Sequence, residues 1–235
     1  MRTFIALIPA KGVSSRLPRK NLQKLGQLTL LEHAIDIAQK SEIFQTVVVT
    51  TESDEIAEVS SIRGAVVHRR RGSAAAPSAS ASDVVLDFIE NFSNQLTDDD
   101  VLFYLQPTSP LRSVEDILGC SGMLMREDYA YPIVSVTVED TSPFKSLVVD
   151  SDGKLQCLFS EQLATSNTEL LPTTYKANGN VFAFTVGQFR SRQTFPLAGG
   201  SPIVIDQTRS VDIDTATDLE VARRSIERNS PETST

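Results

Sequence analysis

The 235-residue chain contains few of the residues that stabilise small secreted proteins or bind zinc. Its two cysteines, Cys120 and Cys157, cannot form a disulfide framework, so we expect reduced thiols in a cytoplasmic protein. Its two histidines, His33 and His68, are too few for a histidine-rich zinc site. A secreted disulfide scaffold and a zinc protein are therefore both excluded.

The sequence also lacks a long hydrophobic run and an excess of positive charge. No apolar segment approaches the ~20 residues of a membrane span, and the apolar stretch 4–10 is too short for the core of a signal peptide. Lysine and arginine number 22 against 30 aspartate and glutamate, which gives a net charge of −8. Because nucleic-acid binding needs a basic surface, we expect neither a nucleic-acid nor a membrane partner. The remaining composition is typical of one large globular domain.

Short apolar runs alternate with helical patterns along the chain. Apolar and β-branched runs predict strands at 3–9, 46–50, 65–68, 101–105, 133–138, 181–186 and 203–205. The spacing of apolar residues predicts helices at 29–40, from 54, at 85–92, at 114–126 and at 216–228. Strands separated by helices of this length indicate right-handed βαβ crossovers. We therefore expect an α/β protein with a mostly parallel sheet.

Residues 139–177 interrupt this alternation. The stretch has two prolines, a Ser-Asp-Gly turn and no long amphipathic helix, so we predict an insertion of short strands and loops that forms a lid or an oligomerisation arm. It carries more apolar residues than a solvated loop would: Phe144, Leu147, Val148, Val149, Leu155, Leu158 and Phe159. Burial against the same sheet is possible, but pairing in a homodimer is the commoner solution. The single domain is predicted to span 1–228, with a disordered tail at 229–235.

The segment after the first predicted strand carries the strongest chemical signal. Between Ala10 and Asn21 it holds a glycine, two serines and four cations: Gly12, Ser14, Ser15, Lys11, Arg16, Arg19 and Lys20. Ligands of open α/β folds bind at the carboxyl ends of the strands, where N–H groups and cations can hold a polyphosphate. The pattern is neither a Walker P-loop nor a dinucleotide fingerprint. The alternative, a merely solvated basic loop, explains poorly why an acidic protein gathers four cations there.

Two aspartates, Asp212 and Asp214, precede the last predicted helix. If residues 211–214 are extended, both carboxylates point to one face, because side chains alternate along a strand. Such carboxylates repel each other unless a cation lies between them, and Mg²⁺ shared with substrate phosphates is the usual occupant. The alternative is that Asp214 only caps the helix. Thr215 with Asp218 three residues later is typical of a capping box.

Three further segments place polar residues at strand ends. The turn 106–112 follows the strand at 101–105, is stiffened by two prolines, and offers Gln106 and Thr108 for hydrogen bonds. Asn178-Gly179 predicts a turn with positive φ, by default a hairpin turn. The arginines 69–71 follow the third strand, where a solvated charged face is the usual interpretation.

Taken in order, these segments resemble the acylneuraminate cytidylyltransferases, the CMP-sialic acid synthetases. The resemblance covers residues 3–226 and rests on the loop 9–21, the Gln-Pro-Thr-Ser-Pro-Leu-Arg segment 106–112, Asn178-Gly179, and Ser-Val-Asp-Ile-Asp-Thr at 210–215. It implies a Rossmann-like nucleotidyltransferase fold with an inserted dimerisation arm. It also implies a Mg²⁺-dependent reaction in which CTP and a sialic-type sugar acid give a CMP-sugar and pyrophosphate.

Two alternatives stay open beside this reaction. One is a nucleotidyltransferase that acts on another sugar or with another nucleotide. The other is a non-catalytic member that binds nucleotide, because Lys11, Val13 and Ser15 stand where the family commonly has Arg, Gly and Lys. The intact Lys20, Asp212 and Asp214 favour the active enzyme.

The resemblance further implies roles for individual residues. The implied catalytic residues are Lys11, Arg16, Lys20, Asp212 and Asp214, with the two aspartates as metal ligands. The implied nucleotide-binding residues are Ala10, Lys11, Gly12, Ser14, Lys20, Asn21 and, near the cytosine, Arg69 or Arg70, whose register is ambiguous by one residue. The implied sugar-binding residues are Gln106, Thr108, Asn178 and Lys145, the last near the sugar carboxylate.

Overall fold

A central sheet organises the protein in the computed structural model, which describes residues 2–92, 96–139 and 142–229. Across these residues seven strands pair in the order β11-β7-β10-β6-β1-β4-β5. Their bounds are Phe4–Pro9 (β1), Thr46–Thr51 (β4), Val66–Arg69 (β5), Val101–Tyr104 (β6), Ile133–Val138 (β7), Tyr175–Thr185 (β10) and Ser201–Val204 (β11). Pairing is parallel except that β10 runs antiparallel to β6 and β7. The mostly parallel α/β fold predicted from the sequence is confirmed.

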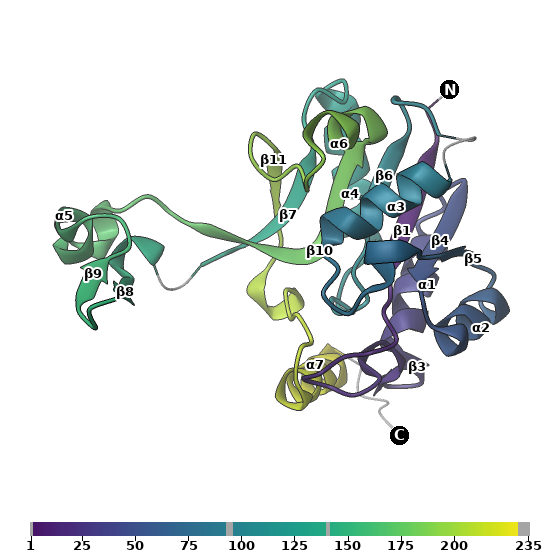
Figure 1. The fold of residues 1–235 in the computed structure, drawn as a ribbon, viewed down its shortest axis with the longest axis horizontal. Coiled ribbons are helices and arrows are strands. Elements are labelled where there is room, and N and C mark those ends of the chain that lie inside the picture. The colour runs from purple at the N-terminus through teal and green to yellow at the C-terminus, as the bar shows by residue number, and fades with distance from the viewer. Residues whose placement is uncertain (1, 93–95, 140–141, 230–235) are drawn as a thin grey trace.

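Helices cover both faces of the sheet (Figure 1). One face packs against α1 (Leu30–Lys40), α2 (Asp54–Ile62) and α4 (Val114–Arg126), and the other against α3 (Ala81–Asn91) and α6 (Val186–Arg192). Side chains alternate along a strand, so Ala6 and Ile8 of β1 contact the first set while Ile5 and Leu7 contact the second. Burial on both faces is why β1 consists of a nearly continuous apolar run.

The last helix belongs to a third, smaller core. Here α7 (Ala216–Asn229) packs with the hairpin of β2 (Lys24–Leu25) and β3 (Leu28–Thr29). The capping box predicted at its start is present: the Thr215 N–H donates to Asp218 Oδ2 at 2.7 Å, and the Asp218 N–H donates to Thr215 Oγ1 at 3.3 Å. Asn229 ends this helix, and residues 230–235 of the predicted tail lie outside the described residues.

Two local predictions are wrong. Val186 begins α6 instead of ending a strand, because Thr185 caps that helix in a reciprocal pair of hydrogen bonds with Gln188, of 3.0 and 3.1 Å. Asn178-Gly179 forms a bulge inside the long β10 rather than a hairpin turn, since the register with β7 shifts there. The positive φ predicted for this pair is present, at 75° for Gly179.

Residues 142–174, which we call the arm, project from the sheet beyond the ends of β7 and β10 (Figure 1). The arm contains a two-stranded hairpin, β8 (Leu147–Val149) with β9 (Leu155–Cys157), and the short helix α5 (Glu161–Thr165). Within this fully described range not one residue is buried. Short 3₁₀ turns occur in the arm and the body, at Lys20–Leu22, Gly72–Ala75, Pro143–Lys145, Thr168–Leu170 and Gln207–Arg209.

The described helices are all short. The longest of them, α7, has 14 residues, and none in the part of the chain that the structure describes is long and apolar enough to cross a membrane. Cys120 is buried in α4, Cys157 is half-buried in β9, and both are free thiols.

Candidate active site

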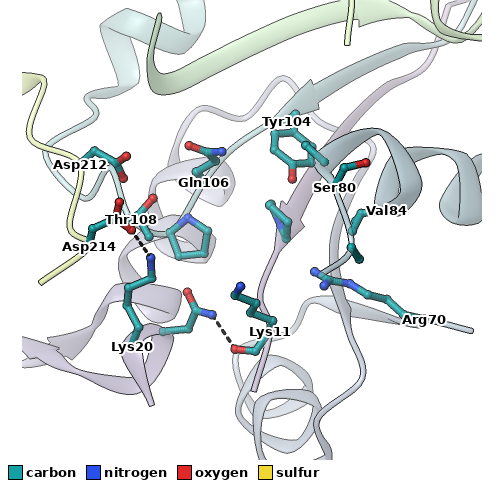
Figure 2. Close-up of a pocket in the computed structure, with 15 residues that line it drawn as sticks. Lys11, Lys20, Arg70, Ser80, Val84, Tyr104, Gln106, Thr108, Asp212 and Asp214 are labelled. Carbon is teal, nitrogen blue, oxygen red and sulfur yellow. Dashed lines mark hydrogen bonds and ion pairs between the residues drawn. The ribbon is translucent and has the colours of Figure 1, made fainter. Parts of the chain in front are cut away.

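A cavity of about 260 Å³ opens at the carboxyl edge of the sheet (Figure 2). Its walls come from the loop after β1, the end of β5, the start of α3, the loop after β6 and the segment before α7. The lining residues are Pro9, Lys11, Lys20, Asn21, Arg70, Ala79, Ser80, Ala81, Val84, Tyr104, Gln106, Pro107, Thr108, Asp212 and Asp214. The position agrees with the rule that open α/β sheets bind ligands outside the carboxyl ends of their strands. We call this cavity the pocket.

Two hydrogen bonds fix the start of the loop after β1. The Ala10 N–H donates to Thr50 O at 3.0 Å, which continues the β1–β4 pairing by one residue. The buried Asn21 donates from Nδ2 to the backbone oxygen of Lys11 at 2.9 Å. With its backbone held in this way, Lys11 extends its side chain into the pocket (Figure 2).

The next residue of the loop, Gly12, lies directly against the chain that follows β4. Its N–H donates to Glu52 Oε1 at 2.6 Å. A Cβ atom at this position would lie 2.8 Å from Cβ of Ser53, a distance that real side chains do not adopt. The close approach of the two backbones therefore requires glycine here.

One pocket carboxylate already pairs with two cations of the loop. Asp214 Oδ1 lies 2.8 Å from Nζ of Lys20, and its Oδ2 lies 2.8 Å from a guanidinium nitrogen of Arg16. The Lys20 side chain is 12% exposed and that of Arg16 is 64% exposed, so solvent screens the Lys20 pair less. The exposed Asp212 lines the pocket beside them and has no ion pair with any described residue.

Backbone contacts place the two aspartates on the pocket wall. Residues 211–214 are not part of a strand, yet their side chains alternate, with Ile213 fully buried between Asp212 and Asp214. The Ile213 N–H donates to Thr108 O at 2.8 Å and so ties this segment to the loop after β6. Because Asp218 supplies the carboxylate of the α7 cap, the Asp214 carboxylate is left to face the pocket.

Arg70 is the arginine after β5 that lines the pocket, and Arg69 lies outside it. The Arg70 side chain is 5% exposed and donates to the oxygen and hydroxyl of Thr50 at 2.8 and 3.2 Å. Burial lowers the pKa of Arg70, and the neighbouring Glu52 carboxylate opposes that shift. Arg69 instead forms a solvent-exposed ion pair with Asp54.

Gln106 lies over Gly179, the glycine of the β10 bulge. A Cβ at Gly179 would clash with the Gln106 amide oxygen, so the bulge and the glutamine leave room for each other only with glycine there. The buried Arg112 donates to the backbone oxygens of Gln106, at 2.8 Å, and of Asn180. Its guanidinium thus joins the loop after β6 to the bulge, and burial lowers its pKa.

A second cavity, also of about 260 Å³, shares Asp212 with the pocket. It is lined by Thr137, Val138, Glu139, Lys176, Ala177, Asn178, Gln207, Ser210 and Asp212. The buried Asn178 accepts a hydrogen bond from Ser135 at 2.7 Å and donates to Ser210 at 3.0 Å. We call this polar space, at the foot of the arm, the side cavity.

Many of the residues singled out from the sequence therefore meet in one place. The pocket brings together Lys11, Lys20, Asn21, Arg70, Gln106, Thr108, Asp212 and Asp214. Arg16 contacts this group through Asp214, and Asn178 lies in the side cavity. Four predicted residues do not line the pocket, namely Ala10, Gly12, Ser14 and Arg69, and Lys145 lies in the arm.

The start of α3 forms a pocket wall that sequence reasoning missed. Ala79, Ser80, Ala81 and Val84 come from the end of a Ser/Ala-rich tract and the first turn of the helix. Ser80 caps α3 by accepting from the Asp83 N–H at 3.1 Å, so the Ser-x-x-Asp pattern was the signal that could have located this wall. The buried Tyr104 was missed too; burial raises the pKa of its hydroxyl.

A Rossmann-like sheet whose carboxyl edge collects cations and two carboxylates defines a protein of the nucleotide-binding α/β class. The profile of the family described as "Cytidylyltransferase" matches residues 5–227, and the chain belongs to this family.

Known proteins agree with this assignment. The chain is 31% identical over 232 residues to the CMP-N,N'-diacetyllegionaminic acid synthase of Legionella pneumophila, covering 96% of this chain and 97% of that one. It is 29% identical over 223 residues to an N-acylneuraminate cytidylyltransferase of Escherichia coli, covering 94% of this chain and 52% of that one. The solved structure of a CMP:2-keto-3-deoxy-manno-octonic acid synthetase complexed with CTP has the same fold, with a TM-score of 0.69 at 16% identity over 97% of this chain and 99% of that one. The Rossmann-like fold and the resemblance to the acylneuraminate cytidylyltransferases are confirmed.

Proposed function

We propose that this cytidylyltransferase activates a nonulosonic, sialic-type sugar acid. The anomeric hydroxyl of the sugar acid gives its proton to water and attacks the α-phosphorus of CTP, the bond to the leaving pyrophosphate breaks, and a CMP-sugar is formed. The observation that carries the proposal is the pair of adjoining cavities that share Asp212, one with three cations in its wall and the other lined by hydroxyl and amide side chains together with Lys176, Glu139 and Asp212. The relatives named above, which make CMP-sugars of this class, support the choice of substrate.

The charges of the pocket suggest how CTP would lie. Figure 2 shows Arg70 at one end and Asp214 with Lys20 at the other, with Lys11 between them. We assign the triphosphate to the Lys11 and Lys20 end and the cytosine to the Arg70 and Ser80 end. Phosphoryl-type transfer of this kind depends mostly on positioning and on charge stabilisation, which these fixed cations would supply.

The residues present fit a magnesium ion that is shared with the substrate. No group of three or more His, Cys, Asp or Glu within the described residues could hold a metal ion by itself. Mg²⁺, however, commonly takes one or two carboxylates and completes its shell with water and phosphate oxygens. We propose that Asp212 and Asp214 are those carboxylates, and that bound Mg²⁺ neutralises phosphate charge. Asp214 also keeps Lys20 and Arg16 directed at the same place.

The sugar acid is assigned to the side cavity and to Gln106 at its border with the pocket. The wall there offers amide and hydroxyl groups from Asn178, Thr137 and Ser210, which suit a polyhydroxylated ligand. Lys176 supplies a positive charge for a carboxylate. The choice among the nonulosonic acids depends on how the side groups of each sugar fit the wall of the side cavity.

Pyrophosphate release with a panel of four nucleoside triphosphates and several sugar acids tests the proposed reaction. We expect release only with CTP, and only with a nonulosonic acid such as N-acetylneuraminic, legionaminic or pseudaminic acid. Release with another nucleotide or another sugar would support the first alternative, a different nucleotidyltransferase. Tight CTP binding without release from any pair would support a non-catalytic member.

We further propose that the chain forms a homodimer through its arm. Seven large apolar side chains of the arm are 44–80% exposed: Leu147, Val148, Val149, Leu155, Leu158, Phe159 and Leu170. Apolar patches of this kind mark protein interfaces, and two-fold pairing is the commonest symmetry. Lys145 lies in the arm and lines neither cavity of its own chain, and we propose that the dimer offers it to the partner's sugar site. Light scattering should give twice the mass of the chain.

A further inference from the structure

Glu52 lies behind the pocket, directly after β4, and is not one of the residues that line it. Its Oε1 accepts the hydrogen bond from the Gly12 N–H at 2.6 Å, and its Oε2 lies 3.6 Å from a guanidinium nitrogen of Arg70. Gly12 follows Lys11, which lies in the middle of the pocket, and Arg70 stands at the end assigned to the cytosine (Figure 2). A single carboxylate outside the pocket therefore contacts both the loop that carries Lys11 and the arginine at one end of the pocket.

Arg70 depends on this carboxylate because it is almost fully buried. Among the described residues, Glu52 is the acidic side chain that forms an ion pair with Arg70. Its Oε2 is itself buried and accepts no hydrogen bond from the described chain, so the guanidinium is its compensating charge. Removal of one member of a buried ion pair leaves an uncompensated charge, which is strongly unfavourable.

The loop depends on the same carboxylate because its backbone has little freedom to move. Gly12 lies against Ser53 so closely that a Cβ would not fit, and its N–H points at Glu52. Thr50, two residues before Glu52, accepts from Arg70 and from the Ala10 N–H. The segment 50–53 thus contacts both the loop and Arg70 and holds them in place from behind the pocket.

We propose that Glu52 is a positioning residue for the nucleotide. Its carboxylate sets the separation between the loop that carries Lys11 and the guanidinium of Arg70 before CTP binds. The identity of the ligand rests on the function proposed above. Because such positioning serves the bound substrate and the transition state alike, its loss should weaken CTP binding much more than turnover.

Two replacements of Glu52 separate its two contacts. Glu52→Ala removes both, so the dissociation constant and the KM for CTP should rise about tenfold or more, with kcat within about threefold. Glu52→Gln keeps a carbonyl oxygen for the Gly12 N–H but removes the charge opposite Arg70, so its KM for CTP should lie between those of the wild type and the alanine variant. The KM for the sugar acid should not change in either variant.

Amide hydrogen exchange at Gly12 reports on the contact without any substrate. Exchange should accelerate about tenfold in Glu52→Ala, where the N–H loses its acceptor, and stay near the wild-type rate in Glu52→Gln. Asp54→Asn is the matched control. Asp54 lies two residues after Glu52, and the change removes its carboxylate from a solvent-exposed ion pair with Arg69. That control should alter neither the exchange at Gly12 nor the affinity for CTP.

Each outcome bears on the inference. An unchanged affinity for CTP in both Glu52 variants, or unchanged Gly12 exchange in a folded Glu52→Ala, would overturn it. If Glu52→Ala does not fold, a weaker affinity for CTP in Glu52→Gln with normal Gly12 exchange supports it, and a wild-type affinity overturns it. Failure of the wild type to bind CTP would overturn the proposed function as well, whereas the exchange results would still show whether Glu52 holds the loop.

Discussion

The body and the arm of this protein treat their apolar side chains in opposite ways. In the body, Leu7 of β1 and Phe103 of β6 are fully buried between two layers of helices. In the arm, Val149 and Leu155 face each other across the β8–β9 hairpin and are each 67% exposed. Since burial of apolar surface drives folding, the body has a core of its own, while the arm leaves its apolar side chains exposed, as the proposed dimer interface requires.

Charged groups divide between the two regions in a related way. Around the pocket, Arg70, Lys20 and Asp214 are each held by a partner within the same chain. Lys145 of the arm is exposed and has no ion pair with a described residue. The difference teaches that the charged groups of the pocket are already paired within the chain, whereas Lys145 of the arm is left for the partner subunit that we propose. Changes in the body should therefore alter chemistry, and changes in the arm should alter assembly.

The largest effect is expected from the aspartates of the pocket. Asp214→Asn or Asp212→Asn should lower turnover by about a hundredfold or more, because each removes a carboxylate from the proposed magnesium site. Pyrophosphate release measures the loss. The melting temperature of Asp212→Asn, whose carboxylate has no ion pair with a described residue, and the mass of both variants from light scattering should stay at their wild-type values.

The arm supplies the control for these aspartates. Asp152→Asn removes an exposed carboxylate from the turn of the arm and should leave turnover unchanged. Near-normal turnover of the Asp212 and Asp214 variants at low Mg²⁺ would contradict the proposed metal site. So would an equal loss in Asp152→Asn, because the chemistry would then not be confined to the body.

Local patterns in the sequence were enough to predict most of the body. The apolar run of β1 and the helical spacing of α1 and α4 are local signals, and the structure has these elements within one residue of the predicted bounds. The pocket lysines and aspartates were found because charge at the carboxyl ends of strands is also visible locally. The same holds for the capping box at Thr215.

Contacts between distant parts of the chain were not predictable in this way. Glu52 belongs to no recognisable motif, because its role depends on the hydrogen bond that it accepts from Gly12, 40 residues earlier in the chain. The Ser-x-x-Asp pattern at Ser80 could locate the start of α3, but the packing of α3 against the sheet is what brings Ser80 to the pocket. The wrong assignment of Val186 is a different case, because the capping box at Thr185 that starts α6 is a local signal that was overlooked.

The second largest effect is expected on assembly. The double change Val149→Lys with Leu155→Glu places opposite charges across the β8–β9 hairpin, which preserves the hairpin while removing apolar surface. We expect the mass from light scattering to fall from that of a dimer to that of a monomer. The affinity for CTP, a property of the body, should not change.

An exposed apolar residue of the body tests whether this effect is specific to the arm. Ile62 of α2 is 76% exposed, and Ile62→Lys should leave the mass unchanged. If the arm variant keeps the wild-type mass, or if Ile62→Lys also yields monomers, the arm is not the interface.

Intermediate effects should separate the two substrates. Lys20→Ala should raise the KM for CTP about ten- to a hundredfold, as loss of a charged hydrogen bond does. Gln106→Ala should raise the KM for the sugar acid about tenfold, as loss of an uncharged one does. Steady-state kinetics with each substrate varied in turn provides both values. A Gln106→Ala variant changed only in its KM for CTP would show that the assignment is wrong.

Lys145 of the arm provides a further test of how the two substrate sites are separated. Lys145→Ala should raise the KM for the sugar acid and leave the KM for CTP and the mass unchanged, because the residue would serve the partner's sugar site. A Lys145→Ala dimer with wild-type constants for both substrates would restrict the sugar site to the body.

The smallest effect is expected from matched helix caps, one in each region. Thr29 caps α1 of the body, where it accepts from the Glu32 N–H at 3.2 Å while its own N–H donates to Glu32 at 2.8 Å. Ser160 caps α5 of the arm by accepting from the Leu163 N–H at 3.2 Å. Thr29→Ala should lower the free energy of unfolding by about 1 kcal/mol. Ser160→Ala should leave it unchanged, because no residue of the arm, α5 included, is buried.

The pH dependence of unfolding distinguishes this cap from a general loss of packing. Burial raises the pKa of Glu32, but hydrogen bonds with Thr29 and the charge of Arg63 outweigh it, so the net pKa lies below the usual 4.5. A depressed pKa stabilises the fold above pH 4.5, and that stabilisation is lost as the pH falls through the lower folded value. Without the Thr29 hydroxyl the Glu32 carboxylate contributes less of this stabilisation. The difference in the free energy of unfolding between the wild type and Thr29→Ala should therefore narrow below pH 4.5. Urea unfolding at pH 7 and in acid measures that difference, and a gap that stays constant would mean that the Thr29 hydroxyl does not stabilise the Glu32 carboxylate.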